Sequence, residues 1–218
     1  MSVDTRIEQA NKAYEQTVFG ADASGLPAAA RELTALEADL ALAQGQNLHA
    51  VYLDQRRLDQ AVEDPRELEL FQRAAELYRS LVDRRGEGEA TFWIGCFHQV
   101  VRDDHETAIP LFEQALALAT EAGDDLTKSY ALRHLGFVNH AAGRLDEARE
   151  HLEESTRLRR ELGFTAGVAA NLIGLAYLAF AQERGQDCAA LLDEADELAA
   201  EVGAKAVRDM VEEARQEM

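Results

Sequence analysis

The chain has 218 residues, of which 22 are Lys or Arg and 41 are Asp or Glu, so its formal net charge at pH 7 is −19. Nucleic-acid affinity requires Lys and Arg that neutralise phosphates, so this charge argues against a nucleic-acid partner, and it also argues against attraction to an anionic membrane surface. Hydrophobic residues make up 47% of the chain, which excludes a disordered protein and predicts a folded core.

The first third of the chain predicts helices of irregular spacing. Four segments have the apolar periodicity of helices, and these are residues 8–19, 28–42, 48–62 and 65–85. We expect Gly45 to break the second of these from the third. Asp64 followed by Pro65 is a typical start of a helix, with the carboxylate as its cap. Residues 28–85 are therefore predicted to form one or two degenerate copies of a helical repeat.

The rest of the chain contains a repeat with an offset of 40 residues. Each copy carries the same apolar positions at helical spacing and ends in a glycine, and the aligned sets are Ala108, Ala148 and Cys188; Phe112, Leu152 and Leu192; Ala115, Ser155 and Ala195; Leu118, Leu158 and Leu198; and Gly123, Gly163 and Gly203. Glycine adopts the left-handed backbone without steric cost, so each copy is predicted to end in a helix with a glycine cap.

A second helix is predicted before each of these. Its marks are Ile94-Gly95, Leu135-Gly136 and Ile173-Gly174. A glycine inside a helix costs about 1 kcal/mol relative to alanine, so its presence at corresponding positions indicates close approach of a neighbouring helix. The unit is then helix A, a short turn and helix B, repeated three times over residues 87–203.

This pattern resembles the tetratricopeptide repeat, whose hallmarks are Leu-Gly on helix A and small residues on helix B. In the middle copy they fall on Leu132, Leu135-Gly136, Ala148, Leu152 and Ser155. The usual proline at the end of helix B is replaced by Thr120, Arg160 and Ala200, and the period is 40 rather than 34 residues. The chain is therefore similar to the long-period variety seen in kinesin light chain and in bacterial regulators.

The resemblance implies an all-α fold, a right-handed superhelical solenoid of antiparallel helix pairs. We expect three parts along the chain: N-terminal helices with the degenerate repeats over 1–86, three repeats over 87–203, and a C-terminal capping helix over 204–218. A polar-faced cap is needed because an end repeat would otherwise leave its apolar face in water.

Arrays of this family line their concave groove with helix A. Carried over by position, the predicted groove residues are Trp93, Cys96, Gln99, Tyr130, Arg133, His134, Phe137, His140 and Asn171, followed by Leu175 and Leu178. Aromatic and cationic side chains thus gather on a protein of charge −19, and a carboxylate would find a favourable field there. The alternative is that these are ordinary polar exposures, with Arg133 paired to a nearby Glu.

Several other polar residues have two interpretations each. His98 and Asn139 stand where the family usually has a packed tyrosine, and either are satisfied by backbone groups or open a polar pocket. Cys96 is either reactive or a small packing residue, whereas Cys188 is predicted to pack. The basic cluster Arg157–Arg160 is predicted to be a solvated ion-pair face rather than a nucleic-acid contact, because acidic residues surround it at helical spacing.

Catalytic and metal-binding motifs do not stand out in the sequence. Gly86-Glu87-Gly88 lacks the third glycine of a dinucleotide loop, and His134 and His140 are six residues apart, unlike an i,i+4 metal pair. We therefore predict no enzymatic activity, no cofactor and no metal. Two cysteines make no disulfide framework, and no signal segment or span of about 18 apolar residues is evident, so a cytoplasmic protein with free thiols is expected.

Three functions remain open at this stage. The favoured one is a protein–protein interaction module that binds a peptide or protein in its concave groove, with an acidic or C-terminal segment docking on Arg133 and His134. The alternatives are a regulator that senses a small molecule, and an enzyme that uses groove His and Arg residues. The chain is expected to be a monomer or a homodimer. An enclosed cavity of ~300 Å³ or more, lined by His and Arg, would favour the alternatives.

Overall fold

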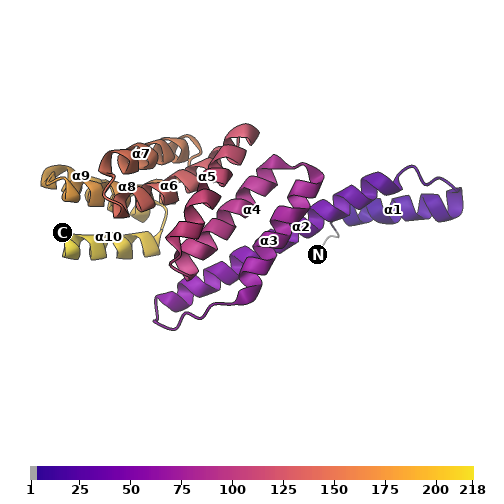
Figure 1. Cartoon of the computed structure of the whole chain (residues 1–218), viewed down its shortest axis with the longest axis horizontal. Helices are drawn as coiled ribbons and strands as arrows, with labels where there is room; N and C mark the ends of the chain where they lie inside the picture. The colour runs from indigo at the N-terminus through magenta and orange to yellow at the C-terminus, as the bar shows by residue number, and fades with distance from the viewer. Residues whose placement is uncertain (1–3) are drawn as a thin grey trace. The chain divides into compact units, whose positions relative to one another are not determined.

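A computed structural model describes residues 4–218, and residues 1–3, which begin the predicted N-terminal part, lie outside it. The described residues form ten α-helices and one short π-helical stretch, with no strand (Figure 1). The prediction of an all-α solenoid of paired helices is confirmed, and its right-handed winding stays a prediction. Two compact units divide the chain, residues 1–104 and 105–218, and each is described by itself.

The first unit contains four α-helices and the π-helical stretch. Their bounds are α1 Thr5–Gly20, α2 Leu26–Arg56, α3 Pro65–Leu81, α4 Arg84–Cys96 and η1 Phe97–Val101. Aspartates begin three of them: the carboxylates of Asp4, Asp64 and Asp83 accept hydrogen bonds from backbone N–H groups in the first turns of α1, α3 and α4. The predicted start at Asp64 is thus confirmed, as caps of this kind satisfy N–H groups that have no helical partner.

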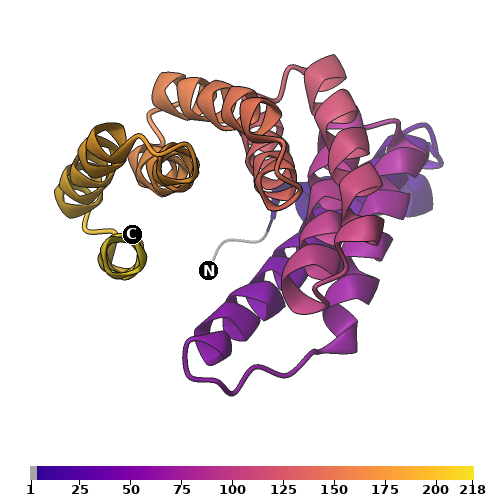
Figure 2. The same cartoon turned by 60° about the vertical axis from the view of Figure 1, so that its left-hand side comes forward.

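Helix α2 runs through the glycine at which we expected a break. Gly45 is buried inside a continuous helix of 31 residues, and a Cβ at this position would lie 2.6 Å from the ring of Phe71 in α3. The glycine therefore marks the place where the aromatic ring packs against the α2 backbone. The extended connection from α2 to α3 begins after Arg56, so the predicted helix over residues 48–62 ends early (Figure 2).

The core of the first unit lies where α2, α3 and α4 pack together. Phe71, Ala74 and Ala90 are fully buried in it, and Trp93 packs at its edge. A buried hydrogen bond also joins two of the helices, since His49 Nδ1 of α2 lies 2.8 Å from Glu67 Oε1 of α3. Helix α1 packs only on α2 among the helix pairs with substantial contact in the described chain.

The second unit consists of six helices, each packed on the next (Figure 1). Their bounds are α5 His105–Ala122, α6 Asp125–Ala141, α7 Leu145–Glu161, α8 Thr165–Ala181, α9 Gly185–Glu201 and α10 Lys205–Glu217. The three aligned glycines end α5, α7 and α9 with φ of +68°, +68° and +67°, as the 40-residue register predicts. The predicted repeat boundaries otherwise stay a prediction.

The helix-A glycines of this unit lie at close helix contacts, as expected. A Cβ on Gly136 of α6 would lie 2.9 Å from Leu152 Cγ and 3.3 Å from the Ala148 carbonyl oxygen of α7. A Cβ on Gly174 of α8 would lie 3.1 Å from both Leu152 and Phe137. Ala148 and Leu152 are fully buried in the resulting core.

The C-terminal helix packs as a cap would. Helix α10 contacts α8 and α9, and its Val211 and Ala214 are fully buried in the same core as Leu192 and Ala195 of α9. Most of its other residues are exposed and charged, such as Arg208 and Glu212. An amphipathic helix of this kind places a polar face outward at the end of the repeats.

Candidate functional site

The predicted groove residues fall in both units. Trp93 and Cys96 lie on α4 and Gln99 in η1, all in the first unit, and the other six lie in the second unit: Tyr130, Arg133, His134, Phe137 and His140 on α6, and Asn171 on α8. The structure places the second group on adjoining helices.

The residues of the first unit are mostly part of its core. The Trp93 ring stacks on Phe71 with centroids 5.7 Å apart and meets the edge of His49 at 5.4 Å. Cys96 is 2% exposed, and burial raises the pKa of its thiol well above its usual value, with the Glu67 carboxylate adding to the effect. A buried neutral thiol is unreactive, so the packing interpretation of Cys96 holds and the open-groove position does not. Gln99 is half-buried.

In the second unit, five of the predicted residues share one side of α6. Tyr130, His134 and Phe137 follow the i, i+4, i+7 spacing of a helical face, and Arg133 and His140 lie beside them. All five are half-buried. We call this surface the α6 face. Asn171 is fully buried beneath it, not exposed as a groove residue would be.

Arg133 is anchored to α8 by hydrogen bonds instead of by a glutamate. Its Nη1 donates to the Ala170 carbonyl oxygen at 2.7 Å and to Asn171 Oδ1 at 2.8 Å. The guanidinium also lies over the Phe137 ring, 4.4 Å from its centroid. The alternative in which Arg133 pairs with a nearby Glu is therefore wrong.

A second arginine lies in the interior next to it. Arg159 of α7 is 2% exposed, its Nη1 donates to the Gly167 carbonyl oxygen at 2.9 Å and to Asn171 Oδ1 at 3.0 Å, and its Nη2 has no hydrogen-bond partner. Tyr130 and Phe164 flank the guanidinium, with ring centroids 4.8 and 5.4 Å from Cζ. Sequence reasoning missed this residue, since it assigned the whole Arg157–Arg160 cluster to an exposed face.

One amide oxygen thus accepts hydrogen bonds from two cations. Asn171 Oδ1 bonds both guanidinium groups, while its Nδ2 donates to Ser155 Oγ at 2.8 Å, and that hydroxyl donates to the Ser129 carbonyl oxygen at 2.6 Å. The chain of bonds joins α6, α7 and α8. Because every member is held by another, the position of Arg133 is fixed from behind.

Among the described residues, the half-buried Arg133 and the buried Arg159 bond carbonyl, amide and hydroxyl oxygens and no carboxylate. Burial lowers the pKa of Arg133 to about 9, and the positive charge of Arg159 adds to the effect. Burial likewise lowers the pKa of Arg159 to about 10. A guanidinium without a counter-ion in a desolvated site is unfavourable, and an incoming anion would relieve it. The site is therefore electropositive inside a protein of charge −19.

Aromatic rings extend the α6 face beside the cation. His134 lies 5.0 Å from Phe112 of α5 and 6.2 Å from Phe137, centroid to centroid. Phe137 also packs on the core below it. Half-buried rings of this kind offer contact area with little loss of side-chain entropy.

His98 and Asn139 have different environments. Asn139 is satisfied by side chains: its Oδ1 accepts from Arg144 at 2.7 and 2.9 Å, and its Nδ2 lies 3.1 Å from His151 Nδ1. His98 lies in η1, its Nδ1 is buried without a hydrogen-bond partner, and Asp104 Oδ2 is 3.8 Å away. Burial lowers the pKa of His98. The prediction of satisfaction by backbone groups is thus wrong for these side-chain atoms, and the π-helical turn was not expected.

The exposed part of the basic cluster is an ion-pair surface, as predicted. Arg157 pairs with Glu154 at 2.7 Å and with Glu161 at 2.6 Å, and Arg160 pairs with Glu194 of α9 at 2.6 Å. Arg159 is the exception described above. The buried stripe Ala148, Leu152, Ser155 and Arg159 has i, i+4, i+7, i+11 spacing, and this periodicity is the signal that could have found it.

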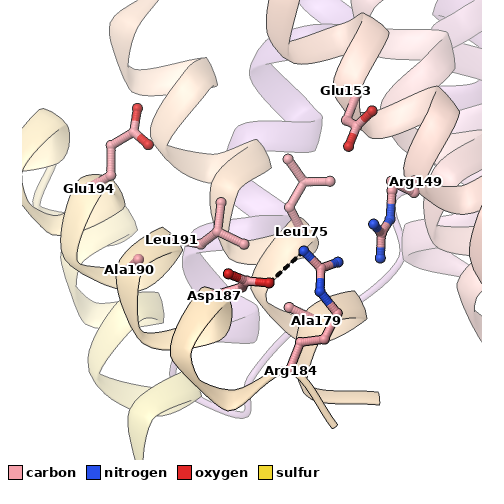
Figure 3. A pocket seen from close by; sticks show the side chains of 9 residues that line it. All are labelled: Arg149, Glu153, Leu175, Ala179, Arg184, Asp187, Ala190, Leu191 and Glu194. Carbon is pink, nitrogen blue, oxygen red and sulfur yellow. Dashed lines mark ion pairs between the residues drawn. The ribbon is translucent and has the colours of Figure 1, made fainter. Parts of the chain in front are cut away.

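A pocket of about 310 Å³ lies in the second unit, between α7, α8 and α9, and Leu175 of the predicted groove lines it. Figure 3 shows Leu175 and Leu191 among its apolar lining, with Arg149 and Glu153 of α7 on one side and the Arg184–Asp187 ion pair on the other. It is an open pocket that no histidine lines. It therefore differs from the enclosed His- and Arg-lined cavity that would favour a sensor or an enzyme.

Within the described range, residues 4–218, no group of three or more His, Cys, Asp or Glu side chains is placed to hold a metal ion. No helix in this range has the length and hydrophobicity needed to cross a membrane. Both cysteines are free and buried, and Cys188 lies in the core of α8 to α10, as its packing role predicts.

Comparison with known proteins agrees with the repeat pattern. Residues 97–161 match the family model described as tetratricopeptide repeat. Tetratricopeptide repeat protein 29 of Macaca fascicularis is 26% identical over 93 residues, and that of Homo sapiens is 23% identical over 93 residues. These matches cover 43% of this chain and 19% of each relative, so the chain spans about a fifth of their length.

A solved structure shares the fold. The crystal structure of BtubC (BKLC) from P. vanneervenii superposes with a TM-score of 0.53 at 15% identity, covering 91% of this chain and 90% of that one. Identity this low supports the helical-repeat fold alone.

Proposed function

The chain contains tetratricopeptide repeats, and from this premise we propose that it is a protein–protein interaction module whose α6 face binds an acidic segment of a partner. The repeats imply a protein partner. The finer assignment, a carboxylate on Arg133, rests on one observation: two desolvated guanidinium groups lie together without a carboxylate in a strongly acidic protein.

A carboxylate fits the chemistry of this site. Arg133 uses one nitrogen, Nη1, to donate hydrogen bonds to Ala170 and Asn171. A guanidinium has five N–H donors in a rigid fork, so the remaining donors are available to a planar anion. The rings of Phe137 and His134 would contact the apolar part of the same segment. The charge of the rest of the surface disfavours an acidic ligand anywhere else, which gives the site its selectivity.

We propose binding without catalysis. His134 and His140 lie on the same helix as Arg133, and the sequence around them carries no recognised catalytic motif. The small-molecule alternative would require an enclosed cavity, and the pocket of about 310 Å³ between α7, α8 and α9 is open and is not lined by Arg133.

The test compares two arginines in the full-length chain. A fluorescent peptide with several acidic residues and a free C-terminal carboxylate is titrated by anisotropy against wild type, Arg133→Gln and Arg157→Gln. Arg157 is the matched control because it is exposed and paired with Glu154 and Glu161 on α7. We expect affinity to fall at least ~10-fold for Arg133→Gln, the loss of one charge-assisted contact, and to change less than ~2-fold for the control.

Two further measurements test the electrostatic part. Affinity should fall with added salt, since exposed charges are screened over ~10 Å at 0.1 M. Arg133→Lys should restore less than half of the lost binding free energy, because an ammonium keeps the charge and loses the planar fork. Full affinity in Arg133→Gln together with loss of affinity in Arg157→Gln would place the working surface on helix B and overturn the proposal.

A further inference from the structure

The two-helix hairpin of α1 and α2 has little core of its own. Ala13 is the one described residue of α1 that is buried. The register of the hairpin is set by two contacts: a Cβ on Gly25 would lie 3.4 Å from Ala13 Cβ, and Arg6 Nη1 pairs with Asp39 Oδ2 at 2.6 Å. Figure 1 shows α1 beside the N-terminal half of α2, beyond the end of α3 and α4. Alanine-sized contacts stabilise a helix pair only weakly.

Several large apolar side chains of this hairpin are exposed to solvent. Three of them lie on one side of α1, Ile7, Tyr14 and Val18, which are 37%, 60% and 53% exposed, and three lie on the first half of α2, Leu26, Leu33 and Leu40, which are 40%, 41% and 54% exposed. We call these six residues the hairpin face. Phe19 at the end of α1 is also exposed, at 83%, but its helical position turns it to another side. Single exposed apolar residues are normal, but an aligned set of six is an unpartnered surface.

Both rows of side chains project to the same side of the hairpin. On α1, Arg6 and Ala13 contact α2 or the loop before it, and Ile7 and Tyr14 are the residues that come directly after them. Gly25 and Asp39 contact α1 in turn, and Leu26 and Leu40 are the residues that come directly after them. One residue is a rotation of 100° about a helix, and in an antiparallel pair equal rotations from the contact line lead to one common side.

The spacing on α2 is that of a helix–helix seam. Leu26, Leu33 and Leu40 are seven residues apart, the repeat that keeps one row of side chains facing a partner helix. Ala30 lies between the first two of them. Glu37, between the second and third, is drawn toward α3 by an ion pair with Arg73 at 2.7 Å. The row therefore presents leucines without an intervening free charge.

We propose that the hairpin face binds the hairpin face of a second copy of this chain, so that two α1–α2 hairpins form a four-helix bundle. The six side chains offer roughly 500 Å² of exposed area, so a symmetric pair would bury about 1,000 Å², which reaches the lower bound for a biological interface. Two-fold pairing brings like rows together, and rows of leucine and aromatic residues are complementary to themselves. This inference concerns assembly and is independent of the α6 face.

Charge on the hairpin gives the association a distinctive salt dependence. Residues 4–40 contain seven acidic residues, Asp4, Glu8, Glu15, Asp22, Glu32, Glu37 and Asp39, and three basic ones, Arg6, Lys12 and Arg31. The net charge of each hairpin is therefore −4, and two copies repel one another. Screening reduces that repulsion, so salt strengthens this pairing, whereas it weakens the proposed binding of an acidic segment.

The test is the mass of the full-length chain in solution. Sedimentation equilibrium over the micromolar range is measured for wild type, Leu33→Glu, Tyr14→Glu and Val202→Glu. Val202 is the matched control because it is an apolar residue of 47% exposure at the end of α9, in the second unit. We expect twice the chain mass of 24.1 kDa for wild type and the control, and a single chain mass for Leu33→Glu and Tyr14→Glu with unchanged far-ultraviolet circular dichroism.

A second readout does not depend on the variants. Amide hydrogen exchange of α1 in the wild-type chain should slow at least ~10-fold between dilute and concentrated samples, since α1 is held by little else. A wild-type chain that sediments at a single chain mass throughout, or a Leu33→Glu chain that keeps twice that mass, overturns the proposal. So does a dimer whose dissociation constant rises with added salt.

Discussion

A single amide side chain organises the candidate site at the scale of residues. Asn171 is fully buried and accepts hydrogen bonds from Arg133 and Arg159, two cations from different helices. The repeat positions of Arg133 and Asn171 predicted that the two residues lie on adjoining helices, so their proximity could be predicted from the sequence. The burial of Asn171 and the approach of Arg159 from beneath were not, because they depend on packing depth between three helices.

Removing the shared acceptor should destabilise the second unit. We expect Asn171→Leu to lower the free energy of unfolding by about 2–4 kcal/mol, since it leaves buried N–H donors of two cations without a partner. Urea denaturation measures the change. The control Asn47→Leu, at an exposed position of α2, should change it by less than about 0.5 kcal/mol.

The double variant separates desolvation from lost packing. In Asn171→Leu with Arg159→Met one of the stranded charges is gone, so the pair should cost less than the sum of the two single changes. If the losses in free energy of unfolding of the two single variants simply add in the double variant, Asn171 does not stabilise Arg159.

His151 should make stability depend on pH. Burial lowers the pKa of His151 below its usual 6.5, although the carboxylates of Glu150 and Glu147 oppose the shift. The unfolded chain takes up a proton as the pH falls through 6.5, while the folded chain resists it, so this contribution is fully present above pH 6.5 and is lost below. The stability difference between wild type and His151→Gln should therefore shrink between about pH 7.5 and pH 5. Parallel urea curves at both pH values test this, and a difference that grows on acidification contradicts it.

At the scale of elements, glycines carry most of what was predictable. The register of 40 residues correctly identified the glycines that end α5, α7 and α9 with positive φ. The Leu-Gly and Ile-Gly pairs, whose spacing is less regular, correctly identified the glycines that let α6 and α8 approach their neighbours. Gly45 is the exception, because the sequence alone does not distinguish a glycine that packs inside a helix from a glycine that ends one. Only the distant ring of Phe71, 26 positions further along the chain, distinguishes them.

Three glycines should respond differently to alanine. Gly136→Ala should cost about 1–3 kcal/mol, because the new methyl group would meet Leu152 and the Ala148 carbonyl oxygen of α7. Gly123→Ala should cost about 1 kcal/mol through strain at φ of +68° alone. Gly185→Ala is the control, since nothing lies within 4 Å and its φ is not positive, and it should be neutral or stabilising. Thermal melts rank the three, and equal losses would refute the assignment of close contact.

At the scale of the whole molecule, the pattern of contacts is local along the chain. In the second unit each helix packs on the next, and α8 also packs on α6 and α10. This arrangement follows from the repeat, which was legible in the sequence. The division into compact units at residue 104 was not predicted, because the 40-residue register runs from α4 into α5 without interruption. The exposed hairpin face was also missed, since its leucines resemble the buried positions of a repeat until burial is known.

Local packing predicts local unfolding. Leu192 of α9 is 3% exposed and packs in the core of α8 to α10, so Leu192→Ala should cost about 2–5 kcal/mol through lost contacts and the cavity left behind. In a repeat array stability is a sum of nearest-neighbour terms, so amide hydrogen exchange should accelerate in α8, α9 and α10 first. The amides around Phe71 in α3 should keep their wild-type protection, because their core is built from α2, α3 and α4. Equal acceleration in both units would mean that the chain unfolds as one cooperative body, and the description by neighbouring repeats would then fail.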